Sequence, residues 1–328
     1  MRPRPHLRPA LLLRPIGTVL RAVRRGLRGE QMGGEGFIVV AVLWILGALA
    51  ALCVVYSGYV RQSAIALRVN DDALAREALV TSSLQLVAYQ LSSPAAERRP
   101  TRGAFRFQLD GADVAVEFIS EAARIDLNSA PKELIAGLFA VLGGGSGAAQ
   151  YADRVLGWRT PPKPNAPNDE ESLYRTAGLS YSPRQAPFND VNELWLVQGL
   201  PPALVERSLP FLTIYSRMAE INVLDAAPEV IAALPGMTPD RLNAFLGERE
   251  SLAANPQFVA DALGTDQKGI TVKGSDAVRV RTRMTLADGR PAAADVVIMR
   301  GSTDDPYRVL SWSGDSEITT ATTLAGGG

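Results

Sequence analysis

The stretch Phe37–Val60, FIVVAVLWILGALAALCVVYSGYV, decides the fold of this chain. Its 24 residues include no charged side chain. At a rise of about 1.5 Å per residue they would form a helix of about 36 Å, and the hydrocarbon core of a bilayer is about 30 Å thick. The stretch therefore predicts a helix that spans a membrane with a modest tilt.

The helical pattern continues beyond the apolar stretch. Between Val60 and Pro94 the chain has no proline and no glycine. Apolar residues recur there at helical spacing and form one stripe, made of Val69, Ala73, Val80, Leu84, Val87 and Leu91. We therefore expect one helix from about Phe37 to Leu91, with its first half in lipid and its second half packed on a soluble domain.

Charge is distributed unevenly about this helix. Residues 1–36 contain eight arginines and two glutamates, whereas the remainder has 26 basic and 32 acidic residues. Positive charge on one flank of a single span keeps that flank in the cytoplasm. We expect a cytoplasmic leader, a retained anchor and an external soluble part. A start at Met32 would remove all eight arginines, and the sequence alone leaves both starts open.

Composition argues against an enzyme. The single histidine, His6, lies in the basic leader, and the single cysteine, Cys53, lies in the apolar stretch. Catalysis by a Ser-His-Asp or Cys-His arrangement, a histidine-ligated zinc site and an internal disulfide are thereby excluded. The chain also has no glycine-rich phosphate loop of the GxxxxGKS type.

Strand patterns occur in two separate parts of the chain. Residues 105–109 and 114–118 alternate between apolar and polar side chains around an Asp110-Gly111 turn signal. Alternation returns in 277–285, 294–299 and 307–312. Between these parts lies helical sequence from Asn128 to about Leu263, interrupted by a loop over 161–171. Strands on both sides of a helical block predict an α+β fold with an all-α domain inserted into an antiparallel sheet.

The helical block contains a weak internal repeat with an offset of 96 residues. Residues 125–136, IDLNSAPKELIA, resemble 221–232, INVLDAAPEVIA. In each copy Ser129 or Asp225 is placed to cap a helix, and a proline and a glutamate follow in its first turn. The repeat predicts two small helical subdomains.

The segment Ala233–Arg241, ALPGMTPDR, is similar to the helix-hairpin-helix of DNA-binding proteins, in which a glycine-rich turn presents backbone amides to a phosphate. Thr238 replaces the second glycine of that turn. The external part of the chain is also net acidic, whereas phosphate affinity depends on accumulated positive charge. We therefore interpret the segment as helix packing and do not expect nucleic-acid binding.

Two acidic patches are candidates for calcium, which takes six to eight oxygen ligands from flexible loops. The candidate ligands are Asp169, Glu170, Glu171, Asp190 and Glu193, with Asn165 and Asn168 beside the first three. No fixed ligand spacing of the EF-hand kind supports the assignment. Simple solvation of these side chains is the alternative.

Several short motifs occur together in a fixed order. They are the Gly36–Phe37 junction, Val42-Leu-Trp-Ile-Leu46, Asp126-Leu-Asn-Ser-Ala-Pro131, Val191-Asn-Glu-Leu194, and Ile221-Asn-Val with Ala233-Leu-Pro-Gly236. In this order they resemble the type II secretion system protein K family, also called general secretion pathway protein K, a family of minor pseudopilins. The resemblance covers nearly all of the chain from Gly36 to Trp312.

This resemblance implies processing and a position in an assembly. Prepilin peptidase would cut after Gly36, and the new N-terminus at Phe37 would be methylated. Most pilin-like proteins carry a glutamate at the fifth mature position, which pairs with the neighbouring subunit, and here that position is Ala41. The missing glutamate implies a subunit with no neighbour ahead of it, at the tip of a periplasmic pseudopilus.

The implied partners are other minor pseudopilins, the inner-membrane secretion platform, prepilin peptidase and membrane lipid. The implied location is the bacterial inner membrane, with a single span, a cytoplasmic N-terminus and a periplasmic C-terminal domain. The leader is longer than is usual in the family. Two alternatives stay open, a minor pilin of a type IV pilus or DNA-uptake machine and an unprocessed membrane-anchored binding protein.

The expected organisation has seven parts. They are a leader (1–36), the transmembrane half of the long helix (37–60), the amphipathic helix with the first strands (61–123), a first helical subdomain (124–215), a second helical subdomain (216–265), the C-terminal strands (266–313) and a flexible tail (314–328).

Overall fold

The structure of the chain is a computed structural model, and it describes residues 34–92, 99–162, 169–252, 255–264, 268–302 and 305–314. Residues 1–33 of the expected leader (1–36), Asn165, Asn168 and residues 315–328 of the expected tail (314–328) lie outside the described residues. The chain divides into two compact units, Met1–Asp72 and Ala73–Gly328. Helix α1 contributes to both units.

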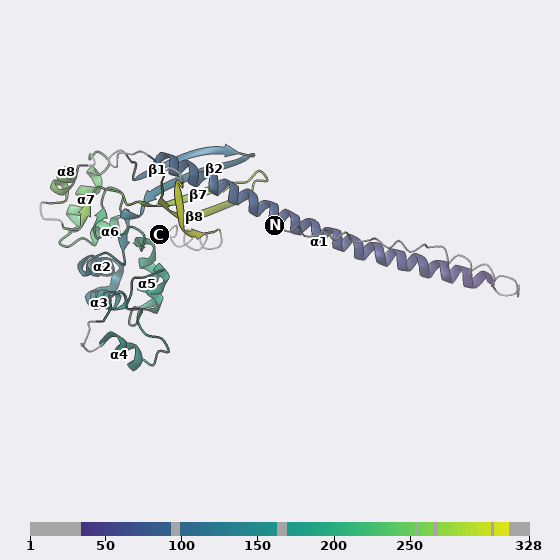
Figure 1. Cartoon of the computed structure of the whole chain (residues 1–328), viewed down its shortest axis with the longest axis horizontal. Helices are drawn as coiled ribbons and strands as arrows, with labels where there is room; N and C mark the ends of the chain where they lie inside the picture. Colours follow the sequence, from purple (N-terminus) through teal and green to yellow (C-terminus); the bar gives the residue numbers. More distant parts are fainter. Residues whose placement is uncertain are drawn as a thin grey trace, which may run out of the picture. The chain divides into compact units, whose positions relative to one another are not determined.

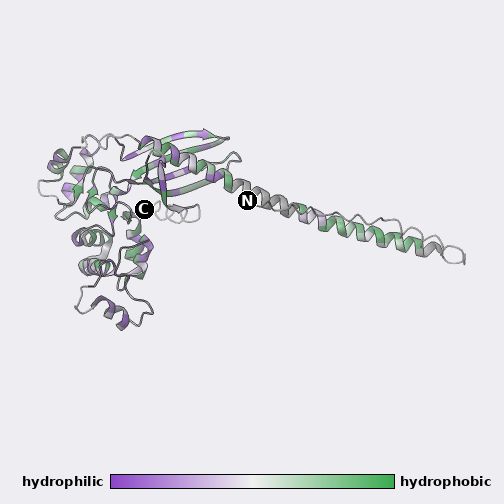
Figure 2. Ribbon diagram, viewed as in Figure 1, coloured by the Kyte–Doolittle hydropathy of each residue, from purple (hydrophilic) through white to green (hydrophobic). Residues whose placement is uncertain are grey.

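Helix α1 runs from Gly34 to Gln90 and contains 57 residues, which confirms the expected long helix. In the first unit its apolar half is uncovered. Every side chain from Ile38 to Val60 is exposed except that of Ala41, which is half-buried. Trp44, for example, is 77% exposed. In Figure 2 the ribbon of this half of α1 is coloured mostly as hydrophobic.

In the second unit α1 packs against a sheet, but the packing begins later than the sequence predicts. The buried residues of this part of the helix are Leu79, Val80, Ser83, Leu84, Val87 and Ala88. Ala73 was expected in the apolar stripe, but it is exposed, and the side chain of Val69 lies outside the described residues. Helical spacing is a property of the chain itself, whereas burial requires a partner surface, and α1 meets that surface from Leu79 onward.

Five antiparallel strands form the sheet, in the order β1-β2-β7-β8-β9. Their bounds are Arg102–Leu109 (β1), Ala112–Ser120 (β2), Ala277–Thr285 (β7), Pro291–Arg300 (β8) and Tyr307–Ser313 (β9). The final turns of α1 lie across one face of this sheet (Figure 1). All five strands predicted from alternation are present, and the strand predicted over 277–285 has the same bounds.

The Asp110-Gly111 turn joins β1 to β2 as predicted. Both residues adopt positive φ, 50° and 77° respectively, which is the backbone conformation of a two-residue hairpin turn and is the reason that Asp-Gly favours it. Alternation along β7 then separates the two faces of the sheet. Val278 and Val280 are buried beneath α1, whereas Arg281 on the opposite face is exposed.

The segment between β2 and β7 is mainly helical. Its helices are η3 Glu121–Ala123, α2 Lys132–Phe139, η4 Ala140–Gly144, η5 Gly145–Gly147, α3 Ala148–Arg159, α4 Asp169–Thr176, η6 Val191–Leu196, α5 Pro202–Ser208, η7 Leu209–Phe211, α6 Pro228–Ala232, α7 Pro239–Glu248 and α8 Pro256–Leu263. Two parallel pairs of two-residue strands interrupt them. These are β3 Ile125–Asp126 with β4 Leu212–Thr213, and β5 Ile221–Asn222 with β6 Ile270–Thr271.

The loop predicted over 161–171 ends earlier than expected, because α4 begins at Asp169. Asp169, Glu170 and Glu171 therefore form the first turn of a helix. Carboxylates are favourable in that turn because the helix dipole places partial positive charge at the N-terminus. The acidic composition of this stretch, read as a loop signal, is instead the start of a helix.

Two hydrophobic cores stabilise the second unit. One lies between α1 and the sheet and includes Leu84, Val87 and Phe118. The other lies within the helical segment and includes Phe139, Trp158 and Phe245. Helices and an antiparallel sheet thus coexist in one compact unit, which confirms the α+β class.

Candidate functional site

The exposed half of α1 is the candidate membrane site. By length and composition Ile38–Val60 qualifies as a membrane-spanning helix. Within the described residues a second stretch, Lys132–Arg159, passes the same test, but its apolar residues include Ile135, Leu138 and Phe139, which are buried in the helical core. Only Ile38–Val60 leaves its apolar side chains uncovered, so this stretch fits a transmembrane anchor.

The residues of the expected processing site lie at the beginning of α1. Gly36 and Phe37 belong to the helical backbone, two and three residues after its first residue, Gly34. Ala41 lies one turn further along and has no carboxylate to bury. Cleavage and methylation at Gly36–Phe37 stay predictions, since geometry alone does not test them.

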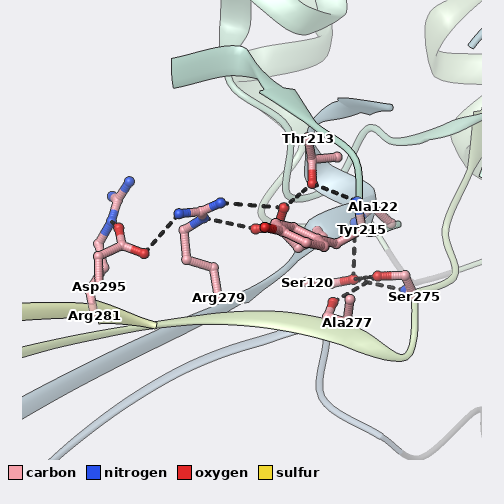
Figure 3. Close-up of polar contacts among 10 residues, drawn as sticks. Ser120, Ala122, Thr213, Tyr215, Ser275, Ala277, Arg279, Arg281 and Asp295 are labelled. Atoms are coloured by element: carbon pink, nitrogen blue, oxygen red, sulfur yellow. Dashed lines mark hydrogen bonds and ion pairs between the residues drawn. The ribbon is translucent and has the colours of Figure 1, made fainter. Parts of the chain in front are cut away.

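A cluster of polar side chains holds the base of the helical segment to the sheet (Figure 3). The chain leaves the sheet at Ser120 and returns to it through Ser275. The Ser120 hydroxyl oxygen accepts hydrogen bonds from the backbone N–H groups of Ser275 at 2.8 Å and Ala122 at 3.2 Å. The Ser275 hydroxyl in turn donates to the carbonyl oxygen of Ala277 at 2.7 Å. These bonds hold the two ends of the helical segment side by side.

Glu121 lies at the centre of this junction between the helical segment and the sheet. Its side chain is fully buried, with 0% of its surface exposed, and it accepts a hydrogen bond from Arg279 Nε at 2.8 Å. The Thr213 hydroxyl also donates to the Glu121 carboxylate. Since Arg279 belongs to β7 and Thr213 to β4, the carboxylate connects the sheet directly to the helical segment.

The charges of the cluster continue across the sheet. Arg279 contacts Asp295 of β8 at 2.8 Å, and Arg281 contacts the same carboxylate at 3.1 Å. Burial lowers the pKa of Arg279, but the carboxylates of Glu121 and Asp295 outweigh it and hold the pKa above its usual value. Burial, together with the charge of Arg279, lowers the pKa of the nearby Arg124 guanidinium to about 10.

Sequence reasoning did not single out this cluster. The available signal was the alternation of arginine along 277–285 combined with one aspartate, Asp295, in the next strand. Glu121 carries no local signal, because its partners Arg279 and Thr213 lie 158 and 92 residues further along the chain. Only tertiary structure brings the three together.

The internal repeat is visible as a shared turn. In the first copy Asp126 Oδ1 accepts hydrogen bonds from the backbone N–H groups of Asn128 at 2.8 Å and Ser129 at 3.1 Å. In the second copy the equivalent Asn222 Oδ1 accepts from Leu224 N–H at 3.1 Å. Each turn follows a two-residue strand and leads into a short helix, so the two copies share one local structure.

The predicted helix caps at Ser129 and Asp225 are wrong. The N-cap residues are Pro131 for α2 and Ala227 for α6, and neither makes a side-chain capping bond. The polar side chain that organises each turn lies earlier, where Asp126 or Asn222 bonds to the backbone two residues ahead. Aspartate and asparagine side chains commonly form such short-range bonds to the backbone, as in Asx turns. The glutamates in the first turns, Glu133 and Glu229, are where the sequence predicts them.

Longer contacts anchor each turn. Asp126 Oδ2 accepts from Ser216 Oγ at 3.0 Å and from Arg217 N–H at 2.8 Å. An arginine at the C-terminal end of a later helix also donates to a carbonyl oxygen of each turn. Arg159 donates to Ala130 at 2.7 Å in the first copy, and Arg249 donates to Ala226 at 2.7 Å in the second.

The loop at Phe188 and Asn189 is bound by side chains from two of the motifs noted above, Asn128 and Glu193. Asn128 exchanges two hydrogen bonds with the backbone of Phe188, of 2.7 and 3.0 Å. Glu193 accepts from the Trp158 indole N–H at 3.1 Å, from Arg184 at 3.2 Å and from the backbone N–H of Asn189 at 3.1 Å. Both motifs therefore have a structural explanation in the packing of the helical segment.

The candidate calcium ligands make separate structural contacts within the helical segment. Asp190 caps η6 through the N–H of Asn192 at 2.7 Å, and Glu193 is occupied as described. Glu170 pairs with Arg154 at 2.9 Å. Its other carboxylate oxygen has no hydrogen-bond partner among the residues that the structure describes, and burial raises the pKa of this carboxyl.

Glu171 lies within 3.4 Å of Arg175, and the side chain of Asp169 lies outside the described residues. Among the described side chains, no three acidic, histidine or cysteine groups gather as a metal site. Calcium binding by these residues stays a prediction.

The turn between α6 and α7 has the geometry of a helical hairpin. Gly236 adopts φ of 74°, which explains the glycine, and Thr238 caps α7 by accepting from Arg241 N–H at 3.3 Å. The residue that replaces the second glycine of the DNA-binding motif thus has a structural role as a helix cap.

Comparison with known proteins gives two findings. Residues 115–217 match a family model described as type II secretion system (T2SS), protein K. A chain of the crystal structure of the GspK-GspI-GspJ complex from the enterotoxigenic Escherichia coli type 2 secretion system has a similar fold. The likeness has a TM-score of 0.50 and 15% sequence identity, and it covers 74% of this chain and 95% of that chain. No curated protein sequence matches the chain.

The matched segment begins in β2 and ends after β4. It therefore contains Glu121 at the junction with the sheet, the first copy of the repeat and the Val191–Leu194 motif. The family match carries the assignment, and the shared fold agrees with it. The family match over residues 115–217 supports a type II secretion system protein K, a minor pseudopilin, and the shared fold is consistent with it.

Proposed function

We propose that this chain caps the tip of a periplasmic pseudopilus and that Phe37–Val60 stores it in the inner membrane before assembly. The observation that carries the proposal is the apolar half of α1, which is uncharged, uncovered and free of the glutamate that most pilin-like proteins place at the position of Ala41. A carboxylate within a bilayer is costly and is kept where it has a partner. A subunit with no neighbour ahead of it has no use for that group.

The helical segment between β2 and β7 suits a cap. Its two ends are held together at Ser120 and Ser275, and it has a core of its own. We infer that it is a domain inserted between strands, with a first subdomain over 124–215 and a second over 216–265. Its bulk would prevent a further subunit from adding at the tip, and its surface would face secreted substrates.

Other minor pseudopilins are the proposed partners, by analogy with the complex of GspK, GspI and GspJ. In the second unit α1 has a face that the sheet does not cover. Tyr89 is 78% exposed and Leu86 is 40% exposed on this part of the helix. An amphipathic helix with such anchors can pack into a groove between partner helices.

The proposal includes a route to the membrane. The arginine-rich leader would stay in the cytoplasm, prepilin peptidase would cut between Gly36 and Phe37, and the new N-terminus would be methylated. The secretion platform of the inner membrane would then lift the subunit, so that the domain from Ala73 onward works in the periplasm.

Mass spectrometry of the protein extracted from membranes tests this route. The expected N-terminus is methylated Phe37, and a Gly36→Leu variant is expected to keep the leader. An intact leader in the wild-type protein would contradict the proposal and favour an unprocessed membrane-anchored binding protein.

Co-purification with candidate minor pseudopilins tests the assembly. We expect the processed chain to form a stable complex with them. Salt-dependent DNA binding without such a complex would favour instead a minor pilin of a type IV pilus or DNA-uptake machine.

A further inference from the structure

A groove lies between α1 and the C-terminal end of β9, within the second unit. Its volume is about 560 Å³. Both elements and the sheet beneath them contribute to its walls, which include Ala73, Val80, Met284, Ala294, Trp312 and Gly314. Most of these side chains are apolar, yet Ala73 is exposed and Trp312 is 46% exposed. The groove therefore leaves apolar surface uncovered.

The sheet ends unevenly beside this groove. Strand β8 begins at Pro291, and β7 pairs with it from that residue onward. Among the strands that the structure describes, β9 pairs with β8 only from Asp295 onward, and Ser313 lies opposite Asp295. Strand β8 thus extends beyond the end of β9 by four residues, 291–294.

The sequence that follows β9 suits an edge strand. After Gly314 it continues as DSEITT, residues 315–320, with no proline. Isoleucine and threonine favour strands, proline would remove a hydrogen bond of the ladder, and charged side chains are common on edge strands. Because Gly314 itself lines the groove, this segment starts at the wall of the groove.

The register of β8 and β9 defines where a longer β9 would lie. Continuing this register by two residues places Asp315 opposite Ala293. The N–H of Leu286 donates to the carbonyl oxygen of Arg290 at 2.9 Å and closes the hairpin of β7 and β8. Such hydrogen-bonded pairs recur at every second residue of an antiparallel ladder. The backbone groups of Ala293 therefore point away from β7, toward the position of Asp315.

Alternation also gives this extension an inner face. Trp312 lies opposite Val296, whose side chain belongs to the core between α1 and the sheet. Every second residue after Trp312 would share this face, so Ile318 would lie on it after Gly314 and Ser316. The extension would therefore present an apolar side chain to the face of the sheet that α1 covers.

We propose that residues 315–318 extend β9 along β8 and occupy the groove beside α1. The extension covers Ala73 and Trp312, so α1 gains a partner surface at the position where its sequence pattern predicts burial. It also closes the edge of β8, to which a strand of another chain could otherwise pair. The flexible tail expected from the sequence then begins after this segment. The inference does not depend on the proposed function.

Hydrogen exchange of the Ala293 amide tests the extension. Mass spectrometry would compare the full chain in detergent micelles with a chain that ends at Gly314. We expect this amide to exchange about tenfold faster in the shortened chain, because its hydrogen bond to the extension is lost. The amides of β1, at the opposite edge of the sheet, should exchange at the same rate in both proteins.

Two proline variants of the full chain test the register. Asp315→Pro removes the N–H that would bond to Ala293, and it should accelerate exchange of the Ala293 amide about as much as the truncation. Ser316→Pro is the matched control, because the N–H of Ser316 would point away from β8, and edge strands tolerate proline at such positions. We expect this variant to exchange at the rate of the wild type.

Two results would overturn the proposal. One is an equal exchange rate of the Ala293 amide in the full and shortened chains. If that equal rate also slowed with increasing protein concentration, a second copy of the chain would occupy this edge instead. The other is equal acceleration by Asp315→Pro and Ser316→Pro, which would mean that the segment does not pair with β8 in this register.

Discussion

At the scale of single residues, Glu121 connects the two parts of the second unit. Its carboxylate is fully buried and accepts hydrogen bonds from Arg279 of the sheet and Thr213 of the helical segment. Replacing it with glutamine removes the charge while keeping the size. We expect Glu121→Gln to lower the free energy of unfolding by about 3 kcal/mol, because breaking a buried ion pair leaves the remaining charge uncompensated. Urea denaturation followed by tryptophan fluorescence measures the loss.

Glu117→Gln is the matched control for this change. Glu117 also pairs with an arginine of β7, Arg283, at 2.9 Å, but the two side chains are 53% and 64% exposed. Exposed pairs contribute about 1 kcal/mol or less. Equal losses in Glu121→Gln and Glu117→Gln would contradict the central role of Glu121.

Asp225 provides a prediction about pH. Its side chain is 3% exposed, and burial raises its pKa above the ordinary value of 3.8, although a hydrogen bond from Thr101 and the charge of Arg102 oppose the shift. A folded-state pKa above the unfolded value means that the folded protein binds the proton more tightly. The resulting stabilisation is complete below pH 3.8 and is lost as pH rises through the folded-state pKa.

The variant Asp225→Asn removes this titration. As pH falls from 7 toward 4, the unfolding free energy of the wild type is expected to rise relative to that of the variant. Urea denaturation of both proteins across this range measures the difference. A difference that stays constant with pH would refute the assignment to Asp225.

At the scale of elements, α1 is one helix with two environments. From Ile38 to Val60 its side chains are uncovered, whereas from Leu79 one face is buried on the sheet. Leu84 and Leu86 separate the two faces of the second part, since Leu84 is 1% exposed and Leu86 is 40% exposed. The same substitution at these two positions should therefore have different consequences.

We expect Leu84→Ala to destabilise the protein by about 2 to 5 kcal/mol, because it removes buried methyl groups and leaves a cavity. Leu86→Ala should cost about 0.5 kcal/mol or less, as surface substitutions usually do. If the proposed partner face is correct, Leu86→Ala should also weaken co-purification with other minor pseudopilins. Urea denaturation and pull-down from detergent extracts measure the two effects, and the reverse pattern would place the partner face elsewhere.

At the scale of the whole molecule, the chain consists of two units that α1 joins by sequence continuity. The second unit, from Ala73, contains both hydrophobic cores. Within it, the side chains of α1 are buried against the sheet from Leu79 onward. A chain that starts at Ala73 should therefore be soluble and unfold cooperatively. A chain that starts at Gln85 lacks Leu79, Val80 and Leu84, and this loss is comparable to the total stability of about 5 to 15 kcal/mol that is typical of proteins.

Analytical ultracentrifugation and urea denaturation of the two truncated chains distinguish these outcomes. The Ala73 form should be monodisperse with a single transition, and the Gln85 form should aggregate or show no transition. A stable Gln85 form would mean that the sheet does not need α1. Aggregation of the Ala73 form would mean that the second unit is not self-contained.

Local sequence patterns predicted most elements but few of the contacts at the candidate site. The Asp-Gly turn and the alternation along 277–285 are signals that neighbouring residues carry, so β1, β2 and β7 were predictable. The turns at Asp126 and Asn222 were located correctly as repeats. Their chemistry was misassigned, because an aspartate that bonds two residues ahead and a serine that caps a helix look alike in sequence.

The sequence by itself determined the long helix, the uncharged span and the strands, because hydrophobic periodicity and turn residues act over a few neighbours. Tertiary structure decided that β2 pairs with β7, that Glu121 meets Arg279, and that α1 is buried from Leu79 and not from Ala73. Each of these features depends on residues that are far apart in the chain. Core packing brings them together, and no local periodicity in the sequence indicates such long-range contacts.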